Sequence, residues 1–374
     1  MDRRCGALAA VIVLLLAGCG PAPGRSGAGV PAGCPADDWD AAVIWSSETA
    51  RSSRVDYVLD DAVVGTQAWP YQGLEPSPDD PSFRDGTDAW LYANGDTLRT
   101  TTHVLRWSQV DCSVQAFEVE EQVIWDVAAD DEAFFTINTV DGVSEVHRRT
   151  MDGRIASEAE VPSAVFSNLV LDGDALHAIG SIGEPGAEQT VVITFDARTM
   201  EERRRLMLGP ASTPLSTLLH EGEVYVPAGA IITADGSEQE VSTVVVADPA
   251  AGTSRTVDLG VPSPFLVVAS SRGPIFAHTY MNSAFRSMDA YGQVIMLDTT
   301  TQETTTADLG PGLRQIAVSG DELLVLTQVE GGPARLTTYA LADLSEQSSV
   351  ELSPPSGGRH YLVGILARLP EPHL

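Results

Sequence analysis

The chain contains 374 residues, of which 52 are acidic and 22 are basic, and its formal net charge is −30. A negative field of this strength repels the phosphates of nucleic acids and of anionic lipid head groups, so nucleic acid is excluded as an expected partner. The length is sufficient for one large domain or two ordinary ones.

The N-terminus has the order of an export signal. Two arginines precede an apolar run over residues 7–16, and small residues and Cys19 follow it. The run is roughly half as long as the ~20 apolar residues that a membrane-spanning helix requires. The stretch Leu16-Ala17-Gly18-Cys19 resembles the lipobox of bacterial lipoproteins.

In that family the signal is cleaved before the cysteine, whose sulfur carries a diacylglycerol. The resemblance implies a signal peptide over residues 1–18 and a bilayer anchor through Cys19 at the outer face of the bacterial cytoplasmic membrane. Two acyl chains hold firmly, because each buried methylene contributes about 0.8 kcal/mol. The alternative is an ordinary secreted protein that is cleaved slightly later, in which Cys19 is incidental.

A flexible tether follows over residues 19–36, since this stretch is nearly all Gly, Pro, Ala and Ser. It lacks the large apolar side chains that a core requires. As a coil it would hold the folded part, residues 37–374, on the order of 20–25 Å from the lipid.

The four cysteines divide by position. Cys5 lies in the signal and Cys19 takes the lipid, which leaves Cys34 and Cys112. Outside the cytoplasm a lone pair of thiols is most simply a disulfide, which would attach the end of the tether to the folded body. Closing so long a loop stabilises by roughly 4 kcal/mol in the chain-entropy model. The alternative is two buried free thiols, and the spacing is not that of a metal site.

One short phrase recurs along the folded part, namely an acidic or glycine-containing turn followed by apolar residues. Its apolar anchors are Val63, Phe134, Leu176, Tyr225, Phe276 and Leu323. Successive anchors are separated by 71, 42, 49, 51 and 47 residues. All intervals except the first match one blade of a β-propeller, which has about 40–50 residues.

A second marker has the same period. Asp196, Asp248 and Asp298 each end an apolar run and begin a turn, where an Asp side chain can bond the backbone two residues further on. Each repeat therefore predicts four short strands rich in Val, Ile, Thr and aromatic residues. Residues 200–208 are the best candidate for a helix, but they fall where a fourth strand is due. We predict a charged edge strand there.

The pattern predicts an all-β chain that folds into a β-propeller of antiparallel four-stranded blades. Over about residues 54–352 it resembles the quinoprotein-like and WD-like propeller families, in rhythm only. Strand-like segments at 41–46 and 360–366 can share one blade and close the ring, which favours seven blades. Six blades is the alternative, with the end segments as extra edge strands.

The wide first interval indicates an insertion near residues 70–90, rich in proline. Trp69, Tyr71, Trp90 and Tyr92 flank this insertion. If exposed, these rings form a candidate binding surface that stacks on sugars or anchors a protein. The alternative is that they cover the insertion and fill a wider first blade.

Residue types for catalysis or metal binding are present but scattered. The seven histidines have no metal spacing, although His177 and His278 lie in comparable strands and could face one channel. The pair Asp130-Asp131 is expected to be a solvated turn, and calcium-loop and nucleophile-elbow patterns are lacking. The sequence thus gives no catalytic residues, metal or cofactor.

These observations favour a non-catalytic binding or scaffold lipoprotein. Its propeller loops or channel would receive an extracellular protein, a glycan or a small molecule. An extracytoplasmic propeller enzyme, such as a hydrolase, lyase or quinone-dependent dehydrogenase, is the alternative. The ligand-capturing component of an importer is disfavoured, because it requires α/β lobes and the helical period is missing.

Overall fold

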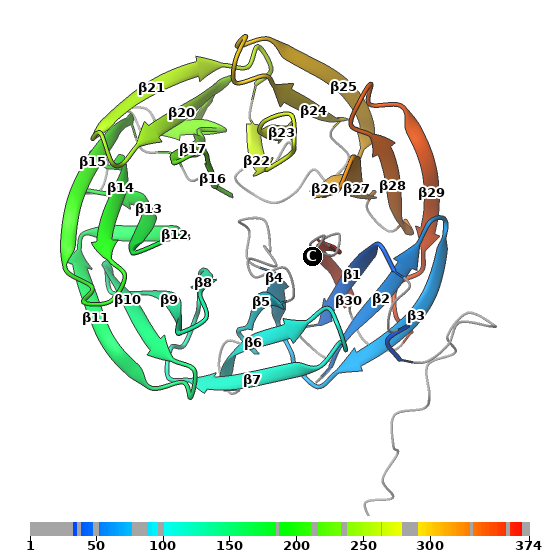
Figure 1. The fold of residues 1–374 in the computed structure, drawn as a ribbon, viewed down its shortest axis with the longest axis horizontal. Helices are drawn as coiled ribbons and strands as arrows, with labels where there is room; N and C mark the ends of the chain where they lie inside the picture. The colour runs from blue at the N-terminus through cyan, green and yellow to red at the C-terminus, as the bar shows by residue number, and fades with distance from the viewer. Residues whose placement is uncertain are drawn as a thin grey trace, which may run out of the picture.

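The described part of the chain is a ring of seven antiparallel four-stranded sheets (Figure 1). The computed structural model describes residues 33–35, 39–47, 52–76, 88–95, 101–184, 187–210, 212, 216–232, 238–262, 264–278, 291–329, 332–356 and 360–368. Within these ranges there are strands and turns but no helix. The predicted seven-bladed β-propeller is confirmed, and the six-bladed alternative is wrong.

Each blade begins with an innermost strand near the axis and ends with an outermost strand at the rim (Figure 1). From the axis outwards, the first blade contains β30 (His360–Ala367), β1 (Ala41–Ser47), β2 (Ser53–Leu59) and β3 (Ala62–Trp69). The second contains β4 (Leu74–Pro76), β5 (Asp88–Ala93), β6 (Thr102–Ser108) and β7 (Val114–Val119). The third contains β8 (Val127–Ala129), β9 (Ala133–Val140), β10 (Val143–Thr150) and β11 (Ile155–Pro162). The fourth contains β12 (Ala164–Asp172), β13 (Ala175–Ile182), β14 (Gln189–Asp196) and β15 (Glu202–Pro210).

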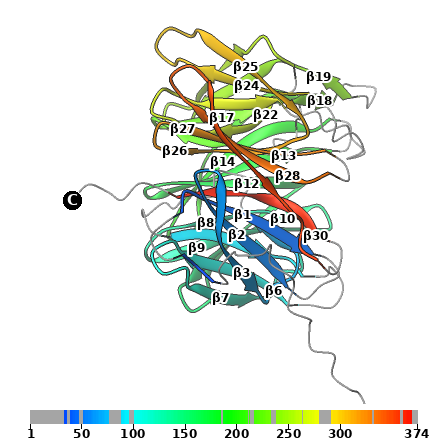
Figure 2. The ribbon, with the colours of Figure 1, turned by 90° about the vertical axis from the view of Figure 1, so that its right-hand side faces the viewer.

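The remaining blades follow the same plan. The fifth contains β16 (Leu218–His220), β17 (Glu223–Pro227), β20 (Thr243–Asp248) and β21 (Thr253–Asp258). The sixth contains β22 (Pro264–Val268), β23 (Ile275–His278), β24 (Tyr291–Leu297) and β25 (Thr304–Pro311). The seventh contains β26 (Leu313–Ser319), β27 (Glu322–Gln328), β28 (Ala334–Ala340) and β29 (Glu346–Leu352). Among the described residues, the fifth blade adds a two-stranded hairpin, β18 (Ala230–Ile232) and β19 (Glu238–Glu240), which Figure 2 shows at one face of the ring.

The two ends of the chain share the first blade, as predicted. β30 pairs with β1 from Ala41↔Ala367 to Ser47↔His360. This pairing gives every blade four strands, so the ring has no open sheet edge at its seam.

The core is divided among the interfaces between blades. Seven apolar clusters lie in the described part, one between each pair of neighbouring blades. Alternation along β9 illustrates the cause: Phe134 packs toward the second blade and Phe135 toward the fourth. Each blade therefore needs both neighbours to bury its two faces, which is why the sheets form a closed ring.

Polar side chains link the inner strands of neighbouring blades. Asp126 accepts a hydrogen bond from the Leu169 N–H at 2.7 Å, and Ser216 accepts one from the Val267 N–H at 2.8 Å. Gln315 of the seventh blade accepts one from the N–H of Ile365, on β30, at 2.6 Å. These bonds satisfy backbone groups beside the bulges of the innermost strands.

The predicted aspartate turns are confirmed between third and fourth strands. Asp196 accepts bonds from the N–H groups of Arg198 and Thr199 at 2.9 and 2.8 Å. Asp298 makes the equivalent pair of bonds, and Asp248 one. The charged stretch after Met200 is the outermost strand β15, largely exposed, as predicted.

The first repeat phrase is out of phase with the others. Residues 60–61 form the turn between β2 and β3, whereas the later phrases form turns between first and second strands. The wide interval after Val63 contains the whole second blade. The predicted insertion near residues 70–90 therefore includes β4 and the start of β5, and residues 77–87 between them lie outside the described part.

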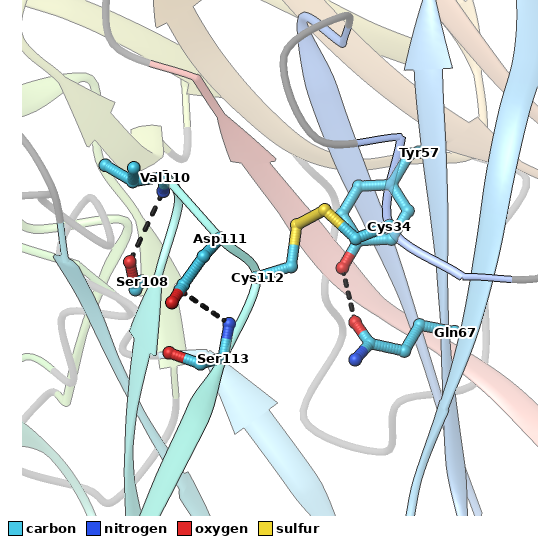
Figure 3. Close-up of a disulfide and its surroundings, with 8 residues drawn as sticks. All are labelled: Cys34, Tyr57, Gln67, Ser108, Val110, Asp111, Cys112 and Ser113. Carbon is cyan, nitrogen blue, oxygen red and sulfur yellow. Dashed lines mark hydrogen bonds between the residues drawn. A yellow bond between two sulfur atoms is a disulfide. The ribbon is translucent and has the colours of Figure 1, made fainter.

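The predicted disulfide between Cys34 and Cys112 is confirmed (Figure 3), with 6.0 Å between the Cα atoms. Cys34 follows Gly33, which bridges to Thr66 on β3, and Cys112 lies in the turn between β6 and β7. A side chain at Gly65 would clash with the Gly33 carbonyl, 2.6 Å from its Cβ position, so glycine allows this close approach. The disulfide thus joins the segment at residues 33–35 to the rim of the first two blades.

Candidate functional site: a charged pocket between the third and fourth blades

A pocket of about 340 Å³ lies between the third and fourth blades. Its wall in the third blade consists of the turn between β8 and β9 and of Arg148 on β10. Its wall in the fourth blade consists of the turn between β12 and β13 and of the turn that follows β14. The lining residues are Asp130, Asp131, Glu132, Arg148, Gly173, Asp174, Ala197 and Arg198.

The turns that form the pocket are held by hydrogen bonds. Asp130 Oδ1 accepts bonds from the N–H groups of Glu132 and Ala133, both at 2.7 Å, which fixes the first turn. Across the blade interface, the Ser157 hydroxyl donates to the Arg198 carbonyl at 3.1 Å. This bond joins the two walls, because Ser157 lies on β11 of the third blade.

One acidic group of the pocket is neutralised from outside it. Arg203 on β15 lies 2.7 Å from Asp174 and 2.5 Å from Asp196. The hydrogen bond from Arg203 lowers the pKa of Asp174. Backbone N–H groups and Arg203 hold the pKa of Asp196 far below its ordinary range. Asp174 is therefore ionised and already paired with Arg203.

The other charges of the pocket have no ion-pair partner within the described residues. These are Asp131 and Glu132 in the inner turn, and Arg148 and Arg198 further from the axis. The carboxylates come from a turn between first and second strands, while the guanidinium groups come from a third strand and a turn after it. The pocket therefore has a negative inner side and a positive outer side.

The predicted aromatic surface is wrong for three of its four rings. Trp69, Trp90 and Tyr92 are 2%, 7% and 4% exposed, and Tyr71 is half-buried. Trp69 packs between the first and second blades, while Trp90 and Tyr92 pack between the second and third. Trp69 ends β3, the outermost strand of the first blade, and Trp90 and Tyr92 share one face of β5, so each ring packs against the neighbouring blade. Trp125 is the tryptophan that is exposed, at 46%.

The two histidines of the channel hypothesis do not line an innermost strand. His177 lies on β13 and His278 on β23, both second strands, so β12 and β22 lie between them and the axis. His177 is buried, its Nδ1 is 3.0 Å from Thr194 Oγ1, and burial lowers its pKa. The histidine side chains therefore do not converge on the axis.

The sequence does not indicate a buried ionic cluster that lies in the third blade around Glu121. Glu121 Oε2 accepts a bond from Arg149 Nη2 at 2.7 Å, and its Oε1 lies 2.8 Å from His147 Nδ1 and 2.7 Å from Thr136 Oγ1. Burial raises the pKa of Glu121, but the bonds from His147, Arg149 and Thr136 outweigh it and bring the pKa to about 2. Both carboxylate oxygens are occupied, so the cluster attaches the connection between second and third blades rather than offering a reactive group. Glu121 follows Glu118 and Glu120 in an acidic stretch, so nothing in the sequence distinguishes it for such a role.

Metal binding finds no support in the described ranges. No group of three or more His, Cys, Asp or Glu side chains there could hold a metal ion. The described part also has no helix of the length and hydropathy needed to cross a bilayer. Cys19 and the tether before residue 33 lie outside it.

Comparisons with known proteins support the fold. No protein-family model matches the chain, and no curated protein does. A hypothetical selenium-binding protein from Sulfolobus tokodaii is similar with a TM-score of 0.56 and 8% identity, over 88% of this chain and 94% of that one. The β-propeller domain of the trilobed protease from Pyrococcus furiosus is similar with a TM-score of 0.53 and 10% identity, over 85% and 96%. A mutant apocarotenoid oxygenase from Synechocystis is similar with a TM-score of 0.50 and 11% identity, over 88% and 93%.

At such identities the likeness shows the fold alone. The Pyrococcus furiosus propeller has an open velcro topology, whereas in this chain β30 and β1 close the ring. The similar proteins include an oxygenase, so the propeller itself does not decide between binding and catalysis.

Proposed function

We propose that this protein is a lipid-anchored binding or scaffold module at the outer face of a bacterial cytoplasmic membrane. Its lipid is carried on Cys19, its tether ends at the Cys34–Cys112 disulfide, and its ring receives a ligand or partner in the pocket between the third and fourth blades.

The proposed location outside the cytoplasm is supported by the N-terminal sequence and by the disulfide. Disulfides persist in oxidising compartments and are rare in the cytosol, which agrees with export. Because Cys34 lies near the end of the tether, the bond would transmit any pull on the tether to the rim of the first two blades. The tether would then be attached at the side of the ring, beside β3 and the turn between β6 and β7.

The binding function is supported by the way the ionisable groups are used. A catalytic site gathers groups with shifted pKa values in one cleft. In this ring the two buried carboxylates with a shifted pKa, Glu121 and Asp56, lie apart, one bonded to Arg149 and the other to Arg54 and Trp45. The pocket instead offers charges of both signs without internal partners, which is the observation that carries this proposal.

The anchor is tested by labelling cells with palmitate. We expect Cys19→Ala to abolish the label and the Cys5→Ala control to retain it, because Cys5 lies in the segment removed with the signal. A Cys19→Ala protein that still carries the label would overturn the lipid assignment.

The binding site is tested by photo-crosslinking in membranes. A benzoylphenylalanine at Glu132 lies in the pocket, whereas one at Asp321 lies in the equivalent exposed turn of the seventh blade. We expect adducts from position 132 alone. Equal adduct yields at the two positions would show that the pocket is not the binding site.

A further inference from the structure

We infer that the pocket between the third and fourth blades takes a small zwitterion, with an amine at one end and a carboxylate at the other, such as an amino acid or a short peptide. This inference rests on the proposed binding function and names its ligand class. The amine would face the inner turn of the third blade, and the carboxylate would face Arg148 and Arg198.

Four charged side chains of the pocket have no ion-pair partner among the described residues. Asp174 is paired with Arg203, and Asp130 accepts two N–H groups of its own turn. That leaves Asp131 and Glu132 for a cation, and the two arginines for an anion. A ligand with a single charge would satisfy one side of the pocket and be repelled by the other, so a ligand with both charges is favoured.

The direction of the ligand follows from the strands. The turn between β8 and β9 adjoins the innermost strand of the third blade, whereas Arg148 lies on the third strand and Arg198 after the third strand of the fourth blade. Opposite charges are thus separated along the radius of the ring. Guanidinium groups recognise carboxylates in a bidentate manner, which suits the outer side to a carboxylate end.

The size and lining of the pocket agree with a small polar ligand. Its volume of about 340 Å³ is near the lower end of ligand sites. Ala197 is its one apolar side chain, since Gly173 has none. Recognition would therefore depend on charge rather than on apolar burial, and it would weaken as ionic strength rises.

Gly173 provides a steric probe that leaves the charges intact. It has a φ of +57°, and a Cβ built on it meets no atom within 4 Å, so a side chain there would enter open space. Asparagine tolerates this backbone conformation. Gly320 has the same φ of +57° and equally open space in the turn between β26 and β27, so Gly320→Asn is a matched control outside the pocket.

The test is calorimetric titration of the full-length lipidated protein in detergent at low ionic strength. The probes are glycine, γ-aminobutyrate and diglycine, with butylamine and butyrate as singly charged controls. We expect at least one zwitterion to bind, and butylamine and butyrate to bind at least about tenfold more weakly, a difference of about 1.4 kcal/mol. Gly173→Asn and Arg198→Ala should weaken that zwitterion about tenfold or more, while Gly320→Asn should leave it unchanged.

Three outcomes would overturn the inference: no heat with any zwitterion, equal binding of butylamine or butyrate, or equal loss in Gly173→Asn and Gly320→Asn. Thermal unfolding of each variant confirms that it is folded before titration. If the titration fails but crosslinking at position 132 is retained, only the zwitterion as ligand class is refuted. If both fail, the proposed binding function is refuted as well.

Discussion

Arg148 and Arg149 are neighbours on β10, yet they lie on opposite faces of the third blade and in opposite surroundings. Arg149 faces the second blade, is 2% exposed, and makes two bonds to Glu121. Arg148 faces the fourth blade and lines the open pocket, without an ion-pair partner in the described residues. One face of the sheet carries a buried charge that is paired at a blade interface, which we call the closed face. The other carries a charge that lines a pocket, which we call the open face.

The difference teaches that a charged side chain on a strand takes its role from the adjoining blade. Phe134, opposite Arg149, packs with Trp90 and Phe117 of the second blade, so that interface excludes water. Phe135, opposite Arg148, lies in the core with the fourth blade, but the pocket opens beyond it. A buried charge must be paired, whereas a charge at an open pocket can be left for a ligand.

The largest expected effect comes from removing Arg149. Arg149→Met leaves the Glu121 carboxylate buried without its cation, which should lower the free energy of unfolding by about 3–5 kcal/mol. Arg148→Met is the matched control, and its effect should stay within about 0.5 kcal/mol. Urea unfolding of the two variants checks this. Equal losses would show that the two faces do not differ as described.

Acid should weaken the interface between the second and third blades, where Glu121 pairs with Arg149. The pKa of Glu121 is lowered from 4.5 to about 2, so the folded state holds its proton less tightly than the unfolded state. The stability from this group is fully present above pH 4.5 and is lost as the pH falls toward 2. Glu121→Gln should remove this contribution. The difference in the free energy of unfolding between wild type and variant should therefore shrink steadily as the pH falls across that window. A difference that does not change with pH would refute the assignment.

The closed ring could be predicted because it is repeated. Short β-rich runs recur with a period near one blade, and the aspartate turns recur with them, so many weak signals add up. The second blade does not stand out in this pattern, because the phrase at residues 60–64 occupies a different turn from the others. Its first strand, β4, has only three residues and therefore carries almost no pattern.

The two faces of the third blade could not be predicted, because each requires closure of the ring. Asp130-Asp131 reads as a solvated turn until the fourth blade places Arg198 on the other wall of the same pocket. Glu121 reads as one more surface acid until β9 and β10 supply Thr136 and Arg149. Aromatic residues on short strands are equally compatible with a surface and a core, and only the neighbouring blade decides that Trp90 is buried.

The smallest expected effect is the dependence on salt, and it separates the two faces most cleanly. Raising the ionic strength from about 0.01 M to about 0.15 M shortens the Debye length from about 30 Å to about 8 Å. The exposed charges of the pocket should then bind the zwitterion found by titration severalfold more weakly, and Arg148→Met should reduce that salt response because it removes one of them. The Arg149–Glu121 pair is only 3% and 1% exposed in its side chains, so the stability lost in Arg149→Met should not change with salt. Titration and urea unfolding at the two ionic strengths measure both responses. If the stability lost in Arg149→Met does depend on salt, solvent ions reach the Arg149–Glu121 pair. The two arginines would then not differ in kind as described.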